Sequence, residues 1–397
     1  MQLLSLGSFL LPVRFALGRL LGGGRDDACA AIRTALPEFA SLQEHTPSEL
    51  LLDYHRSTGA QQMETMLFSG SVVVEPIGRV QVYVSSLGVG FVVVEHTLPE
   101  GMTVNLETDD SREQFKAYEA PLSAAVAPLI EDVSRRIAAA VPTAVTQPRP
   151  SVALPDGSLL WWHRIGLVDT EEAGFHSARW YGTTAQLADG VICRVGNGFT
   201  NLVGAGADVV GDVIEGLMIA TQEWLVVDEA KRLIADHLVA LSGSRQATLI
   251  SVDRQYGEVL QLTEEVALRD LVLNEELRYL ANARNRVKVA ACEAWGTSVE
   301  AADLESRANS LRDLFALRRE RIANNRDDRR NRYIFAFTAL ALVQASLVWY
   351  DFITEDDVTV SKQPRPTVAM IVLLITVLAL GGALLSGPFM TWWRNRR

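Results

Sequence analysis

The pattern of apolar and polar positions separates a mixed amino-terminal part from a strongly apolar carboxyl-terminal part. Tyr333 to Tyr350 contains 18 residues without a formal charge, and Thr367 to Trp393 contains 27. A helix that spans the ~30 Å hydrocarbon layer of a membrane needs about 20 apolar residues, with a range of about 17–25. Aromatic residues stand at the ends of both stretches, where interfacial anchors belong. The pattern therefore predicts transmembrane helices at 333–350 and 367–393 rather than two buried core helices.

Arginines flank this hairpin on both sides. Arg329, Arg330 and Arg332 precede the first stretch, and the basic tail 394–397 follows the second with Arg394, Arg396 and Arg397. Positively charged flanks stay in the cytoplasm, so both termini are expected there, in a multi-pass protein of the inner (plasma) membrane. These arginines are expected to contact phospholipid at the inner surface. Residues 351–366 then form a short external loop with an acidic mouth, made of Asp351, Glu355, Asp356 and Asp357.

The amino-terminal segment 1–24 is apolar but lacks the basic start and the small-residue cleavage site of a signal peptide. Val13, Leu17, Leu20 and Leu21 fall at helical spacing before a run of three glycines. This spacing predicts a short amphipathic helix, which lies either on the membrane or on the body of the protein.

Residues 25–243 are expected to form a cytosolic domain of α+β (mixed α/β) class. Three apolar, β-branched runs between 70 and 100 are separated by glycine turns, which predicts an antiparallel meander. A helix is predicted at about 113–140 and another at about 208–241. Between these helices three further segments have the composition of strands: SLLWWHRIGLV, ARWYGTTAQL and GVICRVGNGFTNLV.

Residues 244–332 are expected to form a helical hairpin and a long stalk. The segment 262–295 is helical in composition and is broken at Trp295 and Gly296. Thr297 followed by Glu300 matches the capping box that starts a helix. No residue breaks the following helix before Tyr333, so one stalk helix is predicted to run directly into the first membrane span.

Charge and cysteine content exclude several classes of protein. The formal net charge is −11, and the acidic excess is concentrated in residues 1–317, which argues against nucleic-acid binding. Three widely spaced cysteines without a CxxC pattern provide neither a disulfide framework nor a zinc site. The sequence contains no GxSxG nucleophile elbow and no HExxH pattern, so no enzyme is expected.

A glycine pattern before a predicted helix is compatible with a bound ligand. Gly204 and Gly206 precede a predicted helix and could present backbone amides to an anion such as a nucleotide, although no GxGxxG or P-loop pattern is present. A simple turn before the helix is the alternative. The ligand of this domain is left unassigned, with a divalent cation or a nucleotide-type molecule as the two options.

Several acidic residues follow along the same helix, and they could gather a divalent cation between subunits or form a solvated face: Asp208, Asp212, Glu215, Glu223 and Asp228. His163 and His176 lack metal-ligand spacing and are interpreted as structural histidines. Trp161 and Trp162 are expected in the core or at a subunit interface.

The first apolar stretch carries one polar line. Gln344 and Asp351 are seven residues apart and therefore share nearly one helix face, which Arg330 and Phe337 extend. Because polar groups facing lipid are costly, this face is expected to line a pore or to pack against another helix. In the second stretch the small residues around Gly382 and Ser386 permit close helix approach.

The order of these parts resembles the CorA-type magnesium transporter superfamily over about residues 70–397: an α/β domain, a helical hairpin, a stalk helix that enters the first span, an acidic loop, a second span and a basic tail. In that family the first span ends in a Gly-Met-Asn motif flanked by aromatic residues. Here the place reads Trp349-Tyr350-Asp351-Phe352, which keeps the aromatic residues and lacks the motif.

The resemblance implies a homo-oligomer, a pentamer in that family, with first-span helices around one axis. Three functions remain open. The first is a channel or pore gated by its cytosolic domain, with a role as a ligand-activated antiviral defence effector among the possibilities. The second is a divalent metal-ion transporter with an altered selectivity mouth. The third is a membrane-anchored sensor or scaffold without conduction.

Overall fold

The computed structural model describes residues 1–16, 19–20, 24–41, 66–99, 102, 108–148, 157–170, 174–176, 182–188, 190–205, 207–243, 254, 256–257, 260, 264, 282–354 and 374. The chain divides into two compact units. The first comprises Met1–Gln246 with Arg254–Leu314, and the second comprises Ala247–Asp253 with Phe315–Arg397. The first unit, called the body below, contains the strands and most of the helices.

The body is built on a nine-stranded sheet. In order across the sheet its strands are β3 (Ala40–Ser41), β4 (Met66–Val74), β5 (Gly78–Ser85), β6 (Val89–Thr97), β1 (Gln2–Leu10), β8 (Leu159–Val168), β11 (Phe199–Val203), β10 (Val191–Val195) and β9 (Thr183–Ala188). Neighbouring strands in this described sheet are antiparallel, except for the parallel pair β8 and β11. A second sheet pairs β2 (Val13–Phe15) with β7 (Thr146–Pro148). The mixed α/β fold class and the meander formed by β4, β5 and β6 are therefore confirmed.

The amphipathic helix predicted for residues 1–24 is wrong over most of its length. Residues 2–10 form β1, which lies between β6 and β8 near the middle of the sheet, and β2 follows directly. Leu3, Leu6 and Phe9 are buried on the two faces of β1. A strand covered on both faces has an almost continuous apolar sequence, and such a run is not distinguished from a helix by its period.

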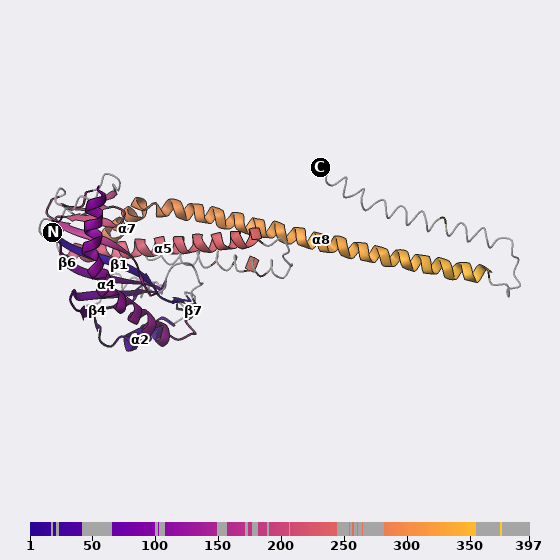
Figure 1. Ribbon diagram of the computed structural model, residues 1–397, viewed down its shortest axis with the longest axis horizontal. Coiled ribbons are helices and arrows are strands. Elements are labelled where there is room, and N and C mark those ends of the chain that lie inside the picture. The colour runs from indigo at the N-terminus through magenta and orange to yellow at the C-terminus, as the bar shows by residue number, and fades with distance from the viewer. Residues whose placement is uncertain are drawn as a thin grey trace, which may run out of the picture. The chain divides into compact units, whose positions relative to one another are not determined.

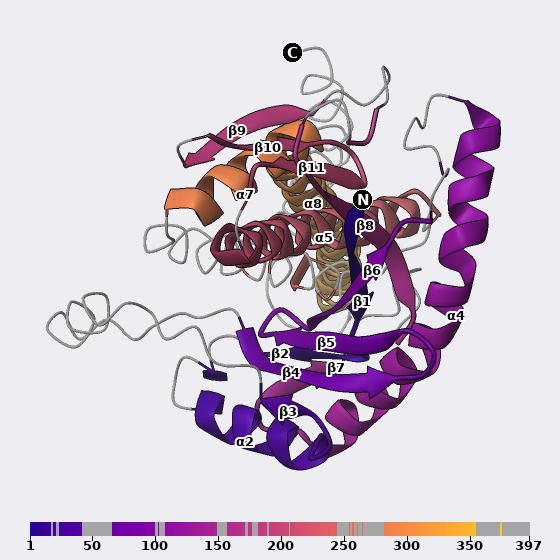
Figure 2. The same cartoon turned by 90° about the vertical axis from the view of Figure 1, so that its left-hand side faces the viewer.

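Helices cover both faces of the sheet. Trp161 and Trp162 are consecutive residues of β8, so their side chains point to opposite faces. The Trp162 indole donates a hydrogen bond of 2.8 Å to Ser123 of α4 (Asp109–Ala140), whereas the Trp161 ring lies 5.6 Å from that of Trp224 of α5 (Ala207–Gly243). Figure 2 shows α4 and α5 on opposite sides of the strands accordingly. On the α4 side, α2 (Arg25–Ala35) packs against α4 and β4.

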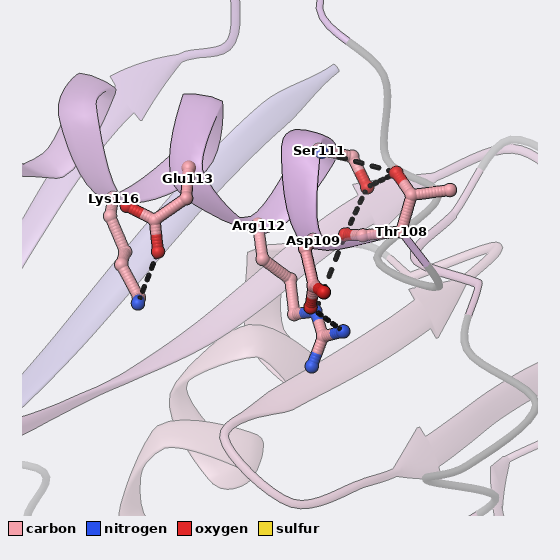
Figure 3. Close-up of polar contacts among 6 residues, drawn as sticks. All are labelled: Thr108, Asp109, Ser111, Arg112, Glu113 and Lys116. Carbon is pink, nitrogen blue, oxygen red and sulfur yellow. Dashed lines mark hydrogen bonds and ion pairs between the residues drawn. The ribbon is translucent and has the colours of Figure 1, made fainter.

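The long helix α4 begins four residues before its predicted start at 113. Thr108 forms the N-cap, and its hydroxyl accepts a hydrogen bond of 3.2 Å from the backbone N–H of Ser111. Asp109 lies in the first turn, where a negative charge is favourable to the helix dipole, and it pairs with Arg112 (Figure 3). The cap stabilises an end that contains few apolar residues, so apolar spacing alone places the start too late.

The short strand β7 was not predicted, whereas the later strands and α5 follow the sequence prediction with small differences. The segment 190–203, read as one region of strand, forms β10 and β11 with a turn between them at Gly198, whose φ is +85°. The described part of the segment 178–187 enters β9 at Thr183. The helix predicted at 208–241 is α5, which extends to Gly243.

The described helices that follow the predicted boundary at 243–244 pack on the sheet domain. Helix α7 (Asn282–Ala294) and the first part of α8 (Thr297–Thr354) belong to the body, because α7 packs on α5, β9 and β10. The predicted break at Gly296 is confirmed, and its φ of +71° ends α7. α8 begins at Thr297, the first residue of the predicted capping box, so it starts three residues before Glu300. The Thr297 hydroxyl has no hydrogen-bond partner among the described residues, and Glu300 pairs with Lys231 of α5 at 3.2 Å. A reciprocal capping box is therefore not formed.

The predicted stalk is confirmed as one helix, since α8 runs without interruption from Thr297 through the first apolar stretch to Thr354 (Figure 1). In the part of the chain that the structure describes, no helix combines the length and the apolar character needed to cross a membrane. Apart from residue 374, the second apolar stretch at 367–393 lies outside the described residues.

Candidate functional site

The acidic residues of α5 form ion pairs with α7. Arg284 of α7 lies 2.7 Å from Asp212 and 2.7 Å from Glu215, and Lys288 lies 2.5 Å from Glu223. Asp228 pairs with Arg232 on its own helix at 2.9 Å. These carboxylates neutralise bases of the fold, so they are not a ready set of oxygen ligands. Among the described residues no group of three or more His, Cys, Asp or Glu could hold a metal ion, and the side chain of Asp208 lies outside that part.

Gly204 occupies a turn between β11 and α5. Its φ is +70°, in the left-handed region that favours glycine, and its amide donates a 3.1 Å hydrogen bond to the carbonyl of Val168. A Cβ at this position would approach the Gly190 carbonyl oxygen to 3.0 Å. This amide is therefore used inside the fold and is not a free donor for an anion. Gly206 lies outside the described residues, and α5 begins directly after it.

His163 lies on the α5 side of β8 and is 1% exposed. Its Nε2 shares a 2.8 Å hydrogen bond with the Thr200 hydroxyl, and its ring lies 5.8 Å from Trp161 and 5.5 Å from Trp295. Burial, with a smaller contribution from Arg164, lowers the pKa of His163 to about 3. The imidazole is neutral at physiological pH and packs among aromatic rings, in agreement with a structural histidine.

The low pKa of His163 predicts a loss of stability in mild acid. The unfolded chain binds a proton at this residue as the pH falls below about 6.5, whereas the folded protein does so only near pH 3. The free energy of unfolding should therefore decrease by about 1.4 kcal/mol for each pH unit between about 6 and 4 through this residue alone. Urea denaturation of the full-length chain at several pH values measures it, with His163→Gln as the comparison. Equal pH dependence in both proteins would contradict this assignment.

A second polar cluster lies under α4 and was not predicted. His96 of β6 bonds through Nε2 to the Ser5 hydroxyl at 2.9 Å and through Nδ1 to the Tyr118 hydroxyl at 2.6 Å, and burial lowers the pKa of His96. Beside it, Arg164 of β8 donates to the carboxylate of Glu119 at 2.7 Å. A serine hydroxyl bonded to a histidine is typical of an activated nucleophile. Ser5, however, has no exposed surface, so no substrate can reach its hydroxyl. The cluster therefore joins α4 to the sheet.

The predicted pore and phospholipid residues are only partly within the described chain. Phe337 and Gln344 lie seven residues apart on α8, and both are exposed. Arg330 and Arg332 are also exposed. Asp351 belongs to α8, but its side chain and that of Arg329 lie outside the described part. The remaining predicted residues also lie outside it: Glu355, Asp356, Asp357, Arg394, Arg396 and Arg397.

Comparison with known proteins finds no matching family model, no similar curated protein and no similar solved structure.

Proposed function

We propose that the protein is a homo-oligomeric membrane channel whose cytosolic body controls a pore lined by the carboxyl-terminal part of α8. The observation that carries the proposal is the continuity of α8. Near its start, Leu304 and Leu311 are 3% and 0% exposed, and Glu300 pairs with Lys231 of α5. Near its end, large apolar side chains are exposed: Tyr333, Ile334, Phe337, Leu340, Leu342, Val343, Leu347 and Trp349. An apolar surface of this kind is typical of contact with a membrane or with another protein chain.

The short length of the first apolar stretch and the polar Gln344 within it favour an assembly of several helices over a single embedded helix. Its 18 residues correspond to about 27 Å of helix, slightly less than the ~30 Å hydrocarbon layer. Arg330 and Arg332 would anchor the inner end at phospholipid headgroups. Gln344 would be costly against lipid, and this cost is removed if several copies turn it toward a shared axis. Asp351, one further heptad along, would then concentrate cations at the mouth of the pore.

The two rival functions, a divalent-cation transporter and a sensor or scaffold, are distinguished from the channel by different features. A divalent-cation transporter is less well supported, because Asp212, Glu215 and Glu223 are paired with basic residues of α7. The order of parts resembles the CorA-type superfamily, and that resemblance supports a pentamer. The missing Gly-Met-Asn motif leaves the conducted species and the gating ligand open. A membrane-anchored sensor or scaffold shares the same hairpin and differs only in conduction.

Ion flux through the full-length protein in liposomes tests the proposal. We expect ion flux, and we expect Asp351→Asn to reduce the preference for cations over anions severalfold, because it removes the ring of negative charge. Gln344→Leu should change conductance, whereas Ser346→Ala is the matched control. Ser346 lies about 200° around the helix from Gln344, and its hydroxyl bonds to the Leu342 carbonyl in the same helix. Membrane insertion without flux of any ion would favour the sensor or scaffold.

A further inference from the structure

A groove of about 430 Å³ lies in the body between β9 and α7. One wall is the backbone and side chains of Thr183–Gln186 in β9, and the other is the face of α7 that carries Arg286, Val289 and Glu293. β9 is the last strand in the order of the described sheet, and its described partner is β10 alone. The groove therefore follows a sheet edge, where backbone donors and acceptors face away from the sheet.

One backbone acceptor at this edge is satisfied by a side chain instead of a strand. The guanidinium Nη1 of Arg286 donates to the backbone carbonyl of Gln186 at 2.5 Å. In an antiparallel sheet, alternate residues direct their backbone groups to the neighbour on each side. The Gln186 carbonyl thus takes from Arg286 a hydrogen bond that a further strand would otherwise provide.

The α7 wall carries a defined sequence of charge. Arg286, Val289 and Glu293 are spaced by three and four residues and therefore share one helix face. Val289 is 53% exposed between a positive end at Arg286 and a negative end at Glu293. Seven helical residues span about 10.5 Å, a distance that three to four residues of extended chain cover at ~3.3 Å each. Because alternate side chains of a strand share one face, the groove is complementary to an extended chain with an acidic and a basic side chain four residues apart and an apolar side chain between them.

We propose that this groove binds an extended peptide segment of another protein, which adds a strand to β9 and lays its side chains against α7. The peptide backbone N–H would replace Arg286 as the donor to the Gln186 carbonyl, and the released guanidinium would pair with the acidic side chain of the peptide. An apolar side chain of the peptide would cover Val289, and its basic side chain would pair with Glu293. Backbone pairing gives affinity in such strand addition, and the side-chain contacts give specificity. The proposal does not depend on channel activity.

Selection of peptides tests the proposal directly. A display library of random octapeptides is screened against the purified full-length protein, and an enriched peptide is measured by fluorescence anisotropy. Enriched sequences should carry an acidic and a basic residue four positions apart, with a β-branched or other apolar residue midway between them. Arg286→Glu should weaken binding at least 10-fold, and a peptide with lysine in place of its acidic residue should recover most of that loss.

One control variant, one further variant of the groove and one modified peptide separate a lost site from a damaged fold. Arg135→Glu changes a surface arginine of α4, on the opposite side of the sheet, and should leave the affinity unchanged. Val289→Lys changes a side chain that is already half exposed, so the variant should fold with unchanged circular dichroism and still bind more weakly. An N-methylated backbone at the residue that pairs with Gln186 should abolish binding of an otherwise identical peptide.

Three results would overturn the proposal. One is a library that yields no enriched peptide. Another is an enriched peptide that binds the Arg286→Glu and wild-type proteins equally. The third is self-association that Arg286→Glu abolishes in sedimentation experiments without any peptide binding, which would assign the groove to a second copy of this chain.

Discussion

Replacement of Arg14 by methionine is expected to lower the free energy of unfolding by about 3–5 kcal/mol, because it leaves the carboxylate of Glu229 buried without its cation. Arg14 of β2 and Glu229 of α5 are each 4% exposed, and the guanidinium Nη2 lies 2.6 Å from the carboxylate. In a site of this kind the charge of one partner cannot be screened by water. Urea denaturation of the purified full-length chain, followed by circular dichroism, measures the change.

The double variant Arg14→Met with Glu229→Leu distinguishes the cost of an unpaired charge from that of altered packing. Removal of both charges should recover most of the lost stability, since apolar side chains of similar volume can replace a buried ion pair at little cost. Arg135→Met, which breaks a more exposed pair with Asp132 on α4, should change stability by less than about 1 kcal/mol. If Arg14→Met proved as mild as Arg135→Met, this buried pair would not contribute as argued.

The meander and the long helices were predictable because their signals are local. β5 alternates polar and apolar residues, β4 and β6 contain runs of valine, and Gly78 and Gly88 in the turns between them adopt positive φ values. α4, α5 and α8 have lengths and apolar spacing that few other structures accommodate. In these segments local preference and tertiary packing favour the same conformation.

β1 was not predictable from its own residues. Its sequence, QLLSLGSFL, has few polar positions because both faces are covered, so neither a period of two nor a period of 3.6 stands out. Pairing with β6 and β8 decides the conformation, and those strands lie about 90 and 155 residues away in the chain. Arg14, which interrupts the apolar run, marks a buried ion pair rather than the polar face of a helix.

The candidate functional residues also divide into those with a local sequence signal and those brought together only by long-range contacts. The polar line through Gln344 was read from spacing along one helix, and α8 places Gln344 and Phe337 on it. The ion pairs of the α5 carboxylates could not be predicted from the sequence, because Asp212 and its partner Arg284 are 72 residues apart in the chain. His96 and Ser5 are likewise 91 residues apart. Only folding brings such residues into contact, and no short pattern in the sequence records it.

The start of α8 connects the sheet to the helix that carries the proposed pore. Trp295 lies just before the break at Gly296, and its ring centroid is 5.5 Å from Trp161 of β8. Its indole N–H donates a 3.0 Å hydrogen bond to the Gly196 carbonyl. The residue therefore fixes the first turn of α8 against the sheet through both a ring contact and a hydrogen bond.

Trp295→Ala is accordingly expected to lower the free energy of unfolding by about 3 kcal/mol, because it leaves a cavity against Trp161 and His163. Trp295→Phe retains a ring and should cost only about 1 kcal/mol, the value of the lost hydrogen bond. Lys231→Met is the matched control at the same junction, since its partly exposed pair with Glu300 should contribute less than about 1 kcal/mol. Denaturation of the three full-length variants, followed by tryptophan fluorescence, gives the ranking. If Trp295→Ala were no more damaging than Lys231→Met, the body would hold α8 by contacts other than this aromatic cluster.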